Sequence, residues 1–173
     1  LHGLQPLQKH QFKFLRLRPS NFPTLRLAQL AALLGKNTKL FSQVLATRNT
    51  KAIHAMLDVE VSQYWQSHYQ FDKSSKKVNH HLGTDMKNIL LINAVAPVLF
   101  AYGKYKDTEE PCDRALELLQ QCHAESNSII SNWGKLGVKA TNAYETQALL
   151  QLKTTYCDKF RCLECGVGIK ILK

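Results

Sequence analysis

The sequence predicts an all-α protein, an irregular multi-helix bundle with an extended N-terminal segment and a cysteine-rich C-terminal turn. Three observations support this fold class. Apolar residues recur at helical spacing in several segments. Prolines that suit a first helical turn follow polar residues that suit a helix N-terminus. No alternating strand pattern of any length occurs.

Length and composition fit one soluble globular domain covering residues 1–173. The chain is 45% hydrophobic and 21% charged, which is ordinary for such a protein. It begins at Leu1 without an initiator Met or a secretory pattern, so we expect the C-terminal part of a longer chain. Five cysteines, an odd number, fit free thiols in the reducing cytoplasm better than a disulfide framework.

The first 57 residues are expected to form an irregular to extended segment, residues 1–20, and then three helices. Arg18 and Phe22 each precede a proline, which disfavours helix at these positions. The first helix then carries Pro23 in its first turn and ends at Gly35. Its apolar positions recur at helical spacing: Leu27, Leu30, Ala31 and Leu34. The two following helices are expected over 38–46 and about 50–57.

A central helix is expected from Thr84 or Asp85 to about Tyr102, with a kink near Asn93 caused by Pro97. Its longest apolar run is shorter than the roughly 20 residues that cross a bilayer, so we expect a buried core helix and no membrane partner. Asn93 lies in an otherwise apolar segment. We therefore expect its amide to be buried and hydrogen-bonded to a neighbouring helix or loop.

Two later helices complete the prediction. Thr108 is expected to cap a helix whose inward side chains are Leu116, Leu119 and Cys122. The apolar stripe then continues to Gly134. Asn142 and Glu145 form an N-cap pair for the last long helix. One face of that helix is expected to carry Tyr144, Ala148, Leu149 and Leu152.

Charge is distributed unevenly along the chain. The net charge is +10, and residues 1–57 hold nine Lys or Arg and no acid before Asp58. Residues 107–125 show the reverse, with six acids against Arg114. A segment of one sign attracts polyanions, so the sequence predicts nucleic-acid contacts, or alternatively a solvated face or a protein-docking segment. The predicted contact residues are Arg16, Arg18, Arg26, Lys36, Lys39, Arg48 and Lys51.

Two further patterns each have a functional and a structural interpretation. Residues 27–45 resemble a helix-turn-helix, in which Ala31 would allow close approach and Gly35 would turn the chain, or an ordinary αα-hairpin. The aromatic cluster within 64–69 could stack on bases or belong to the core. Its members are Tyr64, Trp65, His68 and Tyr69.

The C-terminal cysteines Cys157, Cys162 and Cys165 suit zinc or an iron–sulfur cluster as a cofactor, since thiolates are soft ligands. We expect the three sulfurs to converge within a few ångströms. A fourth ligand would come from five candidates: Cys112, Cys122, His123, His80 and His81. The alternatives are a redox or nucleophilic thiol and simple packing of a tight turn.

No known catalytic motif is present. A phosphate-binding Walker loop, a dinucleotide-binding glycine pattern, a serine nucleophile elbow and a paired-His zinc helix are all missing from the sequence. No catalytic residue is assigned, and the chain is expected to be non-catalytic by itself.

Three stretches together resemble the C-terminal portion of a bacterial family known as domain of unknown function 2851. They are Arg18–Leu30, Asn93–Pro97 and Gln147–Cys165. The resemblance implies an upstream region, absent from this chain, whose carboxylates and histidines look like a nuclease-type metal site. We therefore expect an uncharacterised module that contacts nucleic acid and supports such a region. Alternatives are a protein-interaction or scaffolding domain and a fragment of a metal- or iron–sulfur-containing enzyme.

Overall fold

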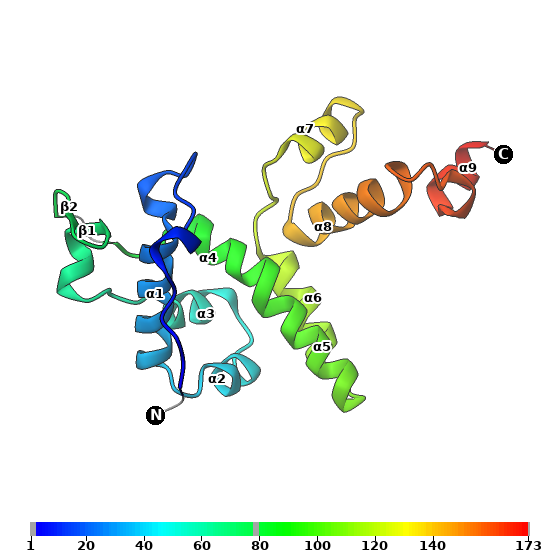
Figure 1. Ribbon diagram of the computed structural model, residues 1–173. Helices are drawn as coiled ribbons and strands as arrows, with labels where there is room; N and C mark the ends of the chain where they lie inside the picture. The colour runs from blue at the N-terminus through cyan, green and yellow to red at the C-terminus, as the bar shows by residue number, and fades with distance from the viewer. Residues whose placement is uncertain (1–2, 78–79, 173) are drawn as a thin grey trace. The chain divides into compact units, whose positions relative to one another are not determined.

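The computed structural model describes residues 3–77 and 80–172 and confirms the all-α fold class (Figure 1). Helices make up 63% of the residues that the structure describes, and strands make up 4%. Contacts divide the chain into two compact units. Unit 1 comprises Leu1–Thr47 and Lys51–Lys87, and unit 2 comprises Arg48–Thr50 and Asn88–Lys173. That the chain is a single domain stays a prediction.

Unit 1 contains short helices and one small antiparallel hairpin. Its 3₁₀ turns are η1 (Lys9–Gln11), η2 (Pro19–Asn21) and η3 (Gln63–Gln66). Its α-helices are α1 (Pro23–Lys36), α2 (Leu40–Ala46) and most of α3 (Thr50–Met56). The hairpin pairs β1 (His68–Gln70) with β2 (Lys73–Ser74), and α4 (Thr84–Leu90) straddles the boundary to unit 2.

The core of unit 1 is formed by the opposite side of α1 from the predicted one. Leu25 and Leu33 are buried, and Gln29 between them donates its amide to the carbonyl of His80 at 2.9 Å. Leu27, Leu30 and Leu34 are instead about half exposed. The helix carries leucines at two overlapping spacings, so periodicity alone did not identify the buried stripe.

The two residues on which the helix-turn-helix prediction depended do not play the expected roles. Ala31 is exposed, so it is no close-approach position. Gly35 lies inside α1, and a Cβ built on it meets no atom within 4 Å. The chain instead leaves α1 through Asn37, whose side chain donates to the carbonyl of Met56 at 3.1 Å.

Unit 2 is built from helices. They are η4, a π-helical turn (Leu91–Val95), α5 (Ala96–Lys106), α6 (Glu110–Gln121), α7 (Ser128–Lys135), α8 (Ala143–Leu152), η5, also π-helical (Lys153–Cys157), η6 (Cys162–Glu164) and α9 (Gly166–Leu172). The pair α5–α6 packs most extensively, with Leu99 and Leu118 fully buried. Leu116 and Leu119 are only half-buried, so the inward face of α6 is rotated from the prediction, although Cys122 is buried as expected.

Gly103 sets how closely α5 and α6 approach. A Cβ built on Gly103 would lie 2.6 Å from Sγ of Cys112 and 2.9 Å from the carbonyl oxygen of Thr108. The Cys112 thiol donates to the carbonyl of Phe100 at 3.5 Å. The two helices therefore touch at a position where only a glycine fits.

The central helix contains a π-turn where the sequence predicted a kink. Asn93 is exposed in this turn, and its amide donates to the carbonyl of Ile89 in its own helix at 3.0 Å. The prediction of a buried Asn93 bonded to another segment was therefore wrong. The hydrogen-bond pattern of a π-turn differs from that of an α-helix, so a backbone carbonyl can lose its usual donor. The Asn93 amide, one turn away, donates to the carbonyl of Ile89.

The whole helix Thr84–Lys106 is longer than its apolar run suggested. Its 23 residues are enough to cross a membrane by length and composition, with a mean hydropathy of 1.4 in the most apolar stretch. Only 28% of that stretch is buried, so the helix is less buried than expected. Core helices of soluble proteins can have the same length and composition, and the absence of a membrane partner stays a prediction.

The predicted cap of α8 is confirmed. The Asn142 side chain accepts a hydrogen bond from the backbone N–H of Glu145 at 3.0 Å. The Glu145 carboxylate accepts from the backbone N–H and the hydroxyl of Thr141, and these bonds lower its pKa. The buried face of α8 carries Ala143 and Thr146 rather than the predicted apolar set.

Candidate nucleic-acid interface

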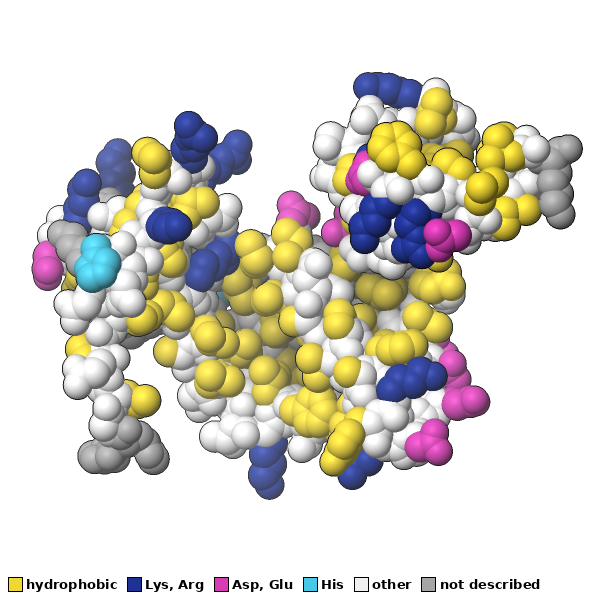
Figure 2. All heavy atoms as spheres, turned by 45° about the vertical axis from the view of Figure 1, so that its right-hand side comes forward, with side chains coloured by type: hydrophobic (Ala, Val, Ile, Leu, Met, Phe, Trp, Pro, Cys, Tyr) yellow, Lys and Arg dark blue, Asp and Glu magenta, His cyan; other side chains and the backbone are white. Residues whose placement is uncertain are grey.

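Positive charge is concentrated in unit 1. Unit 1 holds twelve Lys or Arg against four Asp or Glu, whereas unit 2 holds eleven against nine. Dark-blue Lys and Arg side chains gather at the upper left of Figure 2. Unit 1 therefore has a net charge of +8 (twelve minus four) and unit 2 a net charge of +2 (eleven minus nine).

Four of the seven predicted contact residues are freely placed for an external partner. The side chains of Arg16, Arg18, Lys39 and Lys51 are exposed, and none forms an ion pair with a residue that the structure describes. All four belong to unit 1. Because no carboxylate neutralises them, their charges remain available to a polyanion.

Arg26 and Lys36 serve the fold of unit 1. The Arg26 guanidinium donates to Asn21 at 2.6 Å and to Gln29 at 2.8 Å, tying η2 to α1. Its partial burial lowers its pKa. Lys36 donates to the backbone carbonyl of Asp58 at 2.9 Å. Both side chains are thus engaged inside unit 1.

Arg48 is paired with the acidic segment of its own unit. Its guanidinium lies 3.0 Å from the Glu110 carboxylate, and both side chains are largely exposed. Such surface pairs contribute about 0–1 kcal/mol. The pair nevertheless removes Arg48 from the set of cations without a carboxylate partner.

A row of aromatic rings connects the N-terminal segment to the hairpin. Phe14 lies 5.0 Å from Phe22, and Phe22 lies 6.4 Å from Tyr69, both in edge-on contacts. Phe12 extends the row at 6.4 Å from Phe14. The Thr24 hydroxyl donates to the carbonyl of Tyr69 at 2.5 Å and so holds β1 against α1. The aromatic row thus extends from the N-terminal segment, in which basic residues alternate with phenylalanines, to strand β1 of the hairpin.

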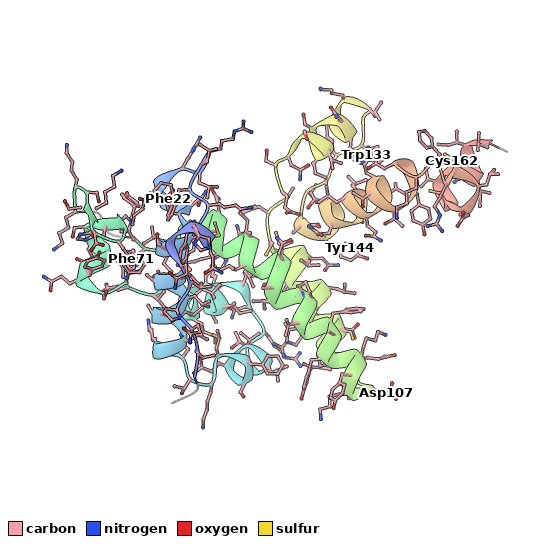
Figure 3. All side chains as sticks on the ribbon, viewed as in Figure 1. Phe22, Phe71, Asp107, Trp133, Tyr144 and Cys162 are labelled. Atoms are coloured by element: carbon pink, nitrogen blue, oxygen red, sulfur yellow. The ribbon has the colours of Figure 1, made fainter. Side chains whose placement is uncertain are left out.

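The hairpin turn presents Phe71 to solvent. The turn residues are Phe71 and Asp72, and Asp72 adopts a left-handed backbone conformation with φ of 57°. The backbone N–H of Asp72 donates to the Tyr64 hydroxyl at 3.1 Å. Trp65 contacts the Phe71 ring edge-on at 5.1 Å. These contacts fix the turn, while Phe71 remains 60% exposed (Figure 3).

The aromatic cluster within 64–69 is not part of the buried core, which excludes the core interpretation. Tyr64 is 41% exposed, and its three cluster neighbours are half-buried. Tyr64 stacks on His68 with a centroid separation of 4.0 Å. The cluster is partly exposed. It supports the hairpin turn through the contact of Trp65 with Phe71 and the hydrogen bond to the Tyr64 hydroxyl, and it does not fill the interior.

Two small pockets, each of about 260 Å³, share Gln70 in their lining. One is lined by Leu7, Phe12, Phe14, Thr24, Gln70, Phe71 and Asp72. The other is lined by Phe22, Tyr69, Gln70, Lys73, Ser74 and Ser75. We call the two pockets, with the neighbouring cations Arg16 and Arg18, the aromatic–basic surface.

The two adjacent histidines after the hairpin have separate structural roles. His80 is buried against the Tyr69 ring at 4.7 Å, and burial lowers its pKa, which favours the neutral form. His81 lies 3.6 Å from the Asp58 carboxylate. Lys87 lies 3.1 Å from the same carboxylate and lowers its pKa, chiefly through their hydrogen bond.

The sequence of residues 1–128 matches a family described as "Protein of unknown function (DUF2851)". The chain belongs to this family. No curated protein and no solved structure matches the chain. The matched residues include the whole aromatic–basic surface and end before the C-terminal cysteines. Membership confirms the resemblance and assigns no activity.

The C-terminal cysteines do not converge as expected. Cys157 and Cys162 are exposed, whereas Cys165 is buried, and all three are free thiols. Over residues 3–77 and 80–172, no three His, Cys, Asp or Glu side chains group in a way that could hold a metal ion. Cys162 begins the 3₁₀ turn η6, whereas Cys165 packs inward like a small apolar residue.

The candidate fourth ligands occupy other structural positions. Cys112 is buried between α5 and α6, and burial raises the pKa of the Cys122 thiol. His123 forms an isolated antiparallel β-bridge with Asn142. Tight packing of α9 on η6 accounts for the turn, because a Cβ on Gly168 would collide with the carbonyl oxygen of Cys162.

Sequence reasoning missed the aromatic half of the candidate interface. Phe12, Phe14, Phe22 and Phe71 were not among the predicted contact residues. The available signal was the alternation of phenylalanine with Lys13, Arg16 and Arg18 in the N-terminal segment. The exposure of Phe71 depends on a hairpin of three and two residues, which is too short to give a strand pattern.

Proposed function

We propose that unit 1 binds nucleic acid through its exposed cations. The observation that carries this proposal is that residues 1–57 contain no carboxylate and that four of their cations, Arg16, Arg18, Lys39 and Lys51, lie exposed and without ion-pair partners among the described residues. Arg16, Arg18, Lys39 and Lys51 are the residues that would contact phosphates. Such contacts position a nucleic acid without reading its sequence.

The distribution of charge favours unit 1 over unit 2 for this role. In unit 2 the acids of residues 107–117 oppose the cations, and Arg48 is already paired with Glu110. A polyanion approaching unit 2 would meet both signs of charge. In unit 1 the cations outnumber the acids by twelve to four, and a surplus of positive charge raises the rate of encounter and the affinity at low salt.

The proposal predicts steep salt dependence. Binding of the complete chain to short fluorescein-labelled oligonucleotides is followed by fluorescence anisotropy between about 50 and 200 mM salt. Neutralising three to six phosphates gives a log–log slope of about −2 to −4 for a single strand, a loss of roughly 20-fold to 300-fold. An affinity that stays flat over this range contradicts the proposal and favours docking of the basic segment on a protein.

A further inference from the structure

We propose that the aromatic–basic surface binds unpaired bases and that Phe71 is a platform on which a base stacks. The nucleic acid bound by unit 1 is accordingly single-stranded. This inference rests on the proposed function and specifies its substrate class. Every base has a flat aromatic face that stacks on an aromatic side chain once it is free of pairing. Bases inside a duplex are already stacked and expose only their edges.

Phe71 lies exposed at the hairpin turn in a fixed position. A phenylalanine that is 60% exposed at a turn loses apolar burial, and here it is held in place rather than loose. Trp65 contacts its ring at 5.1 Å, and the Tyr64 hydroxyl holds the next backbone N–H at 3.1 Å. A preformed platform needs little ordering when a base arrives, which favours binding.

The two pockets have the size and the lining that suit a single base. At about 260 Å³ each, they are smaller than the roughly 300–1,000 Å³ of sites for drug-sized molecules, which suits a single base. Ring atoms of Phe12, Phe14 and Phe71 line one pocket. Gln70, common to both, adds amide groups that can hydrogen-bond to a base edge.

Cations lie near the aromatic residues along the chain. Lys73 lines one pocket, and the exposed Lys76 and Lys77 follow it along the chain. Arg16 and Arg18 lie two and four residues after Phe14, within about 14 Å of extended chain. Cations beside ring-lined pockets provide the combination that tracks a single-stranded backbone while its bases stack.

The roles of Ala31 and Gly35 argue against duplex recognition. The close-approach and turn residues of a helix-turn-helix are exposed and unrestrained in α1. The features that would set a recognition helix into a major groove were therefore not found at these positions. The hairpin surface, by contrast, joins aromatic and basic groups.

The test compares Phe71→Leu with Phe160→Leu. Both remove an exposed ring and keep an apolar side chain, and Phe160, 90% exposed in unit 2, is also flanked by cations, Lys159 and Arg161. Affinities of both variants and the parent chain are measured for oligo(dT) and for a duplex of equal length. Circular dichroism melting checks that each variant folds, and Phe71→Trp tests whether any aromatic ring suffices.

We expect the parent chain to prefer oligo(dT) over the duplex. Phe71→Leu should weaken oligo(dT) binding about 5-fold or more, while duplex binding and the salt slope stay unchanged. Phe71→Trp should retain the affinity, and Phe160→Leu should match the parent. Equal affinity for both polymers with no effect of Phe71→Leu, but with a steep salt slope, overturns this inference alone. Salt-independent binding, or none to either polymer, overturns the proposed function as well.

Discussion

The Gly103→Ala variant is expected to lower the free energy of unfolding by about 1–3 kcal/mol. The added methyl group would lie 2.6 Å from Sγ of Cys112 and 2.9 Å from the carbonyl oxygen of Thr108. Relief requires α5 and α6 to separate, since a backbone atom is among the obstacles. The better helix propensity of alanine, about 0.5–1 kcal/mol, offsets only part of this loss.

Gly134→Ala is the matched control for that variant. Gly134 also lies in a helix of unit 2, α7, but a Cβ built on it meets no atom within 4 Å. Alanine there should leave stability unchanged or raise it by up to about 1 kcal/mol. Urea unfolding followed by circular dichroism compares the two variants. Equal stabilities would mean that α5 and α6 do not pack at the described distance.

The second large effect is expected from replacing Arg16, Arg18 and Lys39 together by glutamine. All three are exposed and without ion-pair partners among the described residues. If each neutralises one phosphate of a single strand, the log–log salt slope should become shallower by about 2. At about 0.1 M salt the same arithmetic gives a loss of roughly 100-fold in affinity.

The control for charge is the triple replacement of Lys104, Lys106 and Lys139 by glutamine. These residues are exposed in unit 2, so the variant changes net charge by the same amount. Its affinity should fall far less than that of the unit 1 variant. Similar losses in both variants would show that binding follows net charge alone and has no preferred surface.

The features of the fold that the sequence predicted correctly depend on residues that are close together in the chain. Asn142 was identified as a cap because its partner, the backbone of Glu145, lies three residues away. Pro23 marked the start of α1 because its fixed φ suits a first turn. Interactions that close within one turn of helix depend little on the rest of the chain.

Features that depend on tertiary contacts were not predictable. The leucines of α1 offered two stripes, and only packing selects the one with Leu25 and Leu33. Cys165 is likewise buried while Cys157 and Cys162 are exposed, and their spacing in the sequence did not specify this difference. Asn93 found its partner within its own helix because a π-turn formed there, which the position of Pro97 did not specify.

Only the cations of the candidate interface could be predicted from the sequence, because its other features depend on tertiary contacts. Charge is a property of the sequence, so the exposed cations Arg16, Arg18, Lys39 and Lys51 were already among the predicted contacts. Whether a cation is already paired with a carboxylate depends on tertiary contacts. Arg48, for example, is paired with Glu110, which lies 62 positions away in the sequence. The exposure of Phe71 depends on the hairpin register.

Photo-crosslinking of oligo(dT) to the complete chain, followed by mass spectrometry of the crosslinked peptides, tests the central claim most directly. The account predicts crosslinks in unit 1, within peptides that contain Phe12, Phe14 or Phe71, and their loss at high salt. Crosslinks confined to unit 2, or a signal no greater than that of an unrelated basic protein of similar charge, would contradict it.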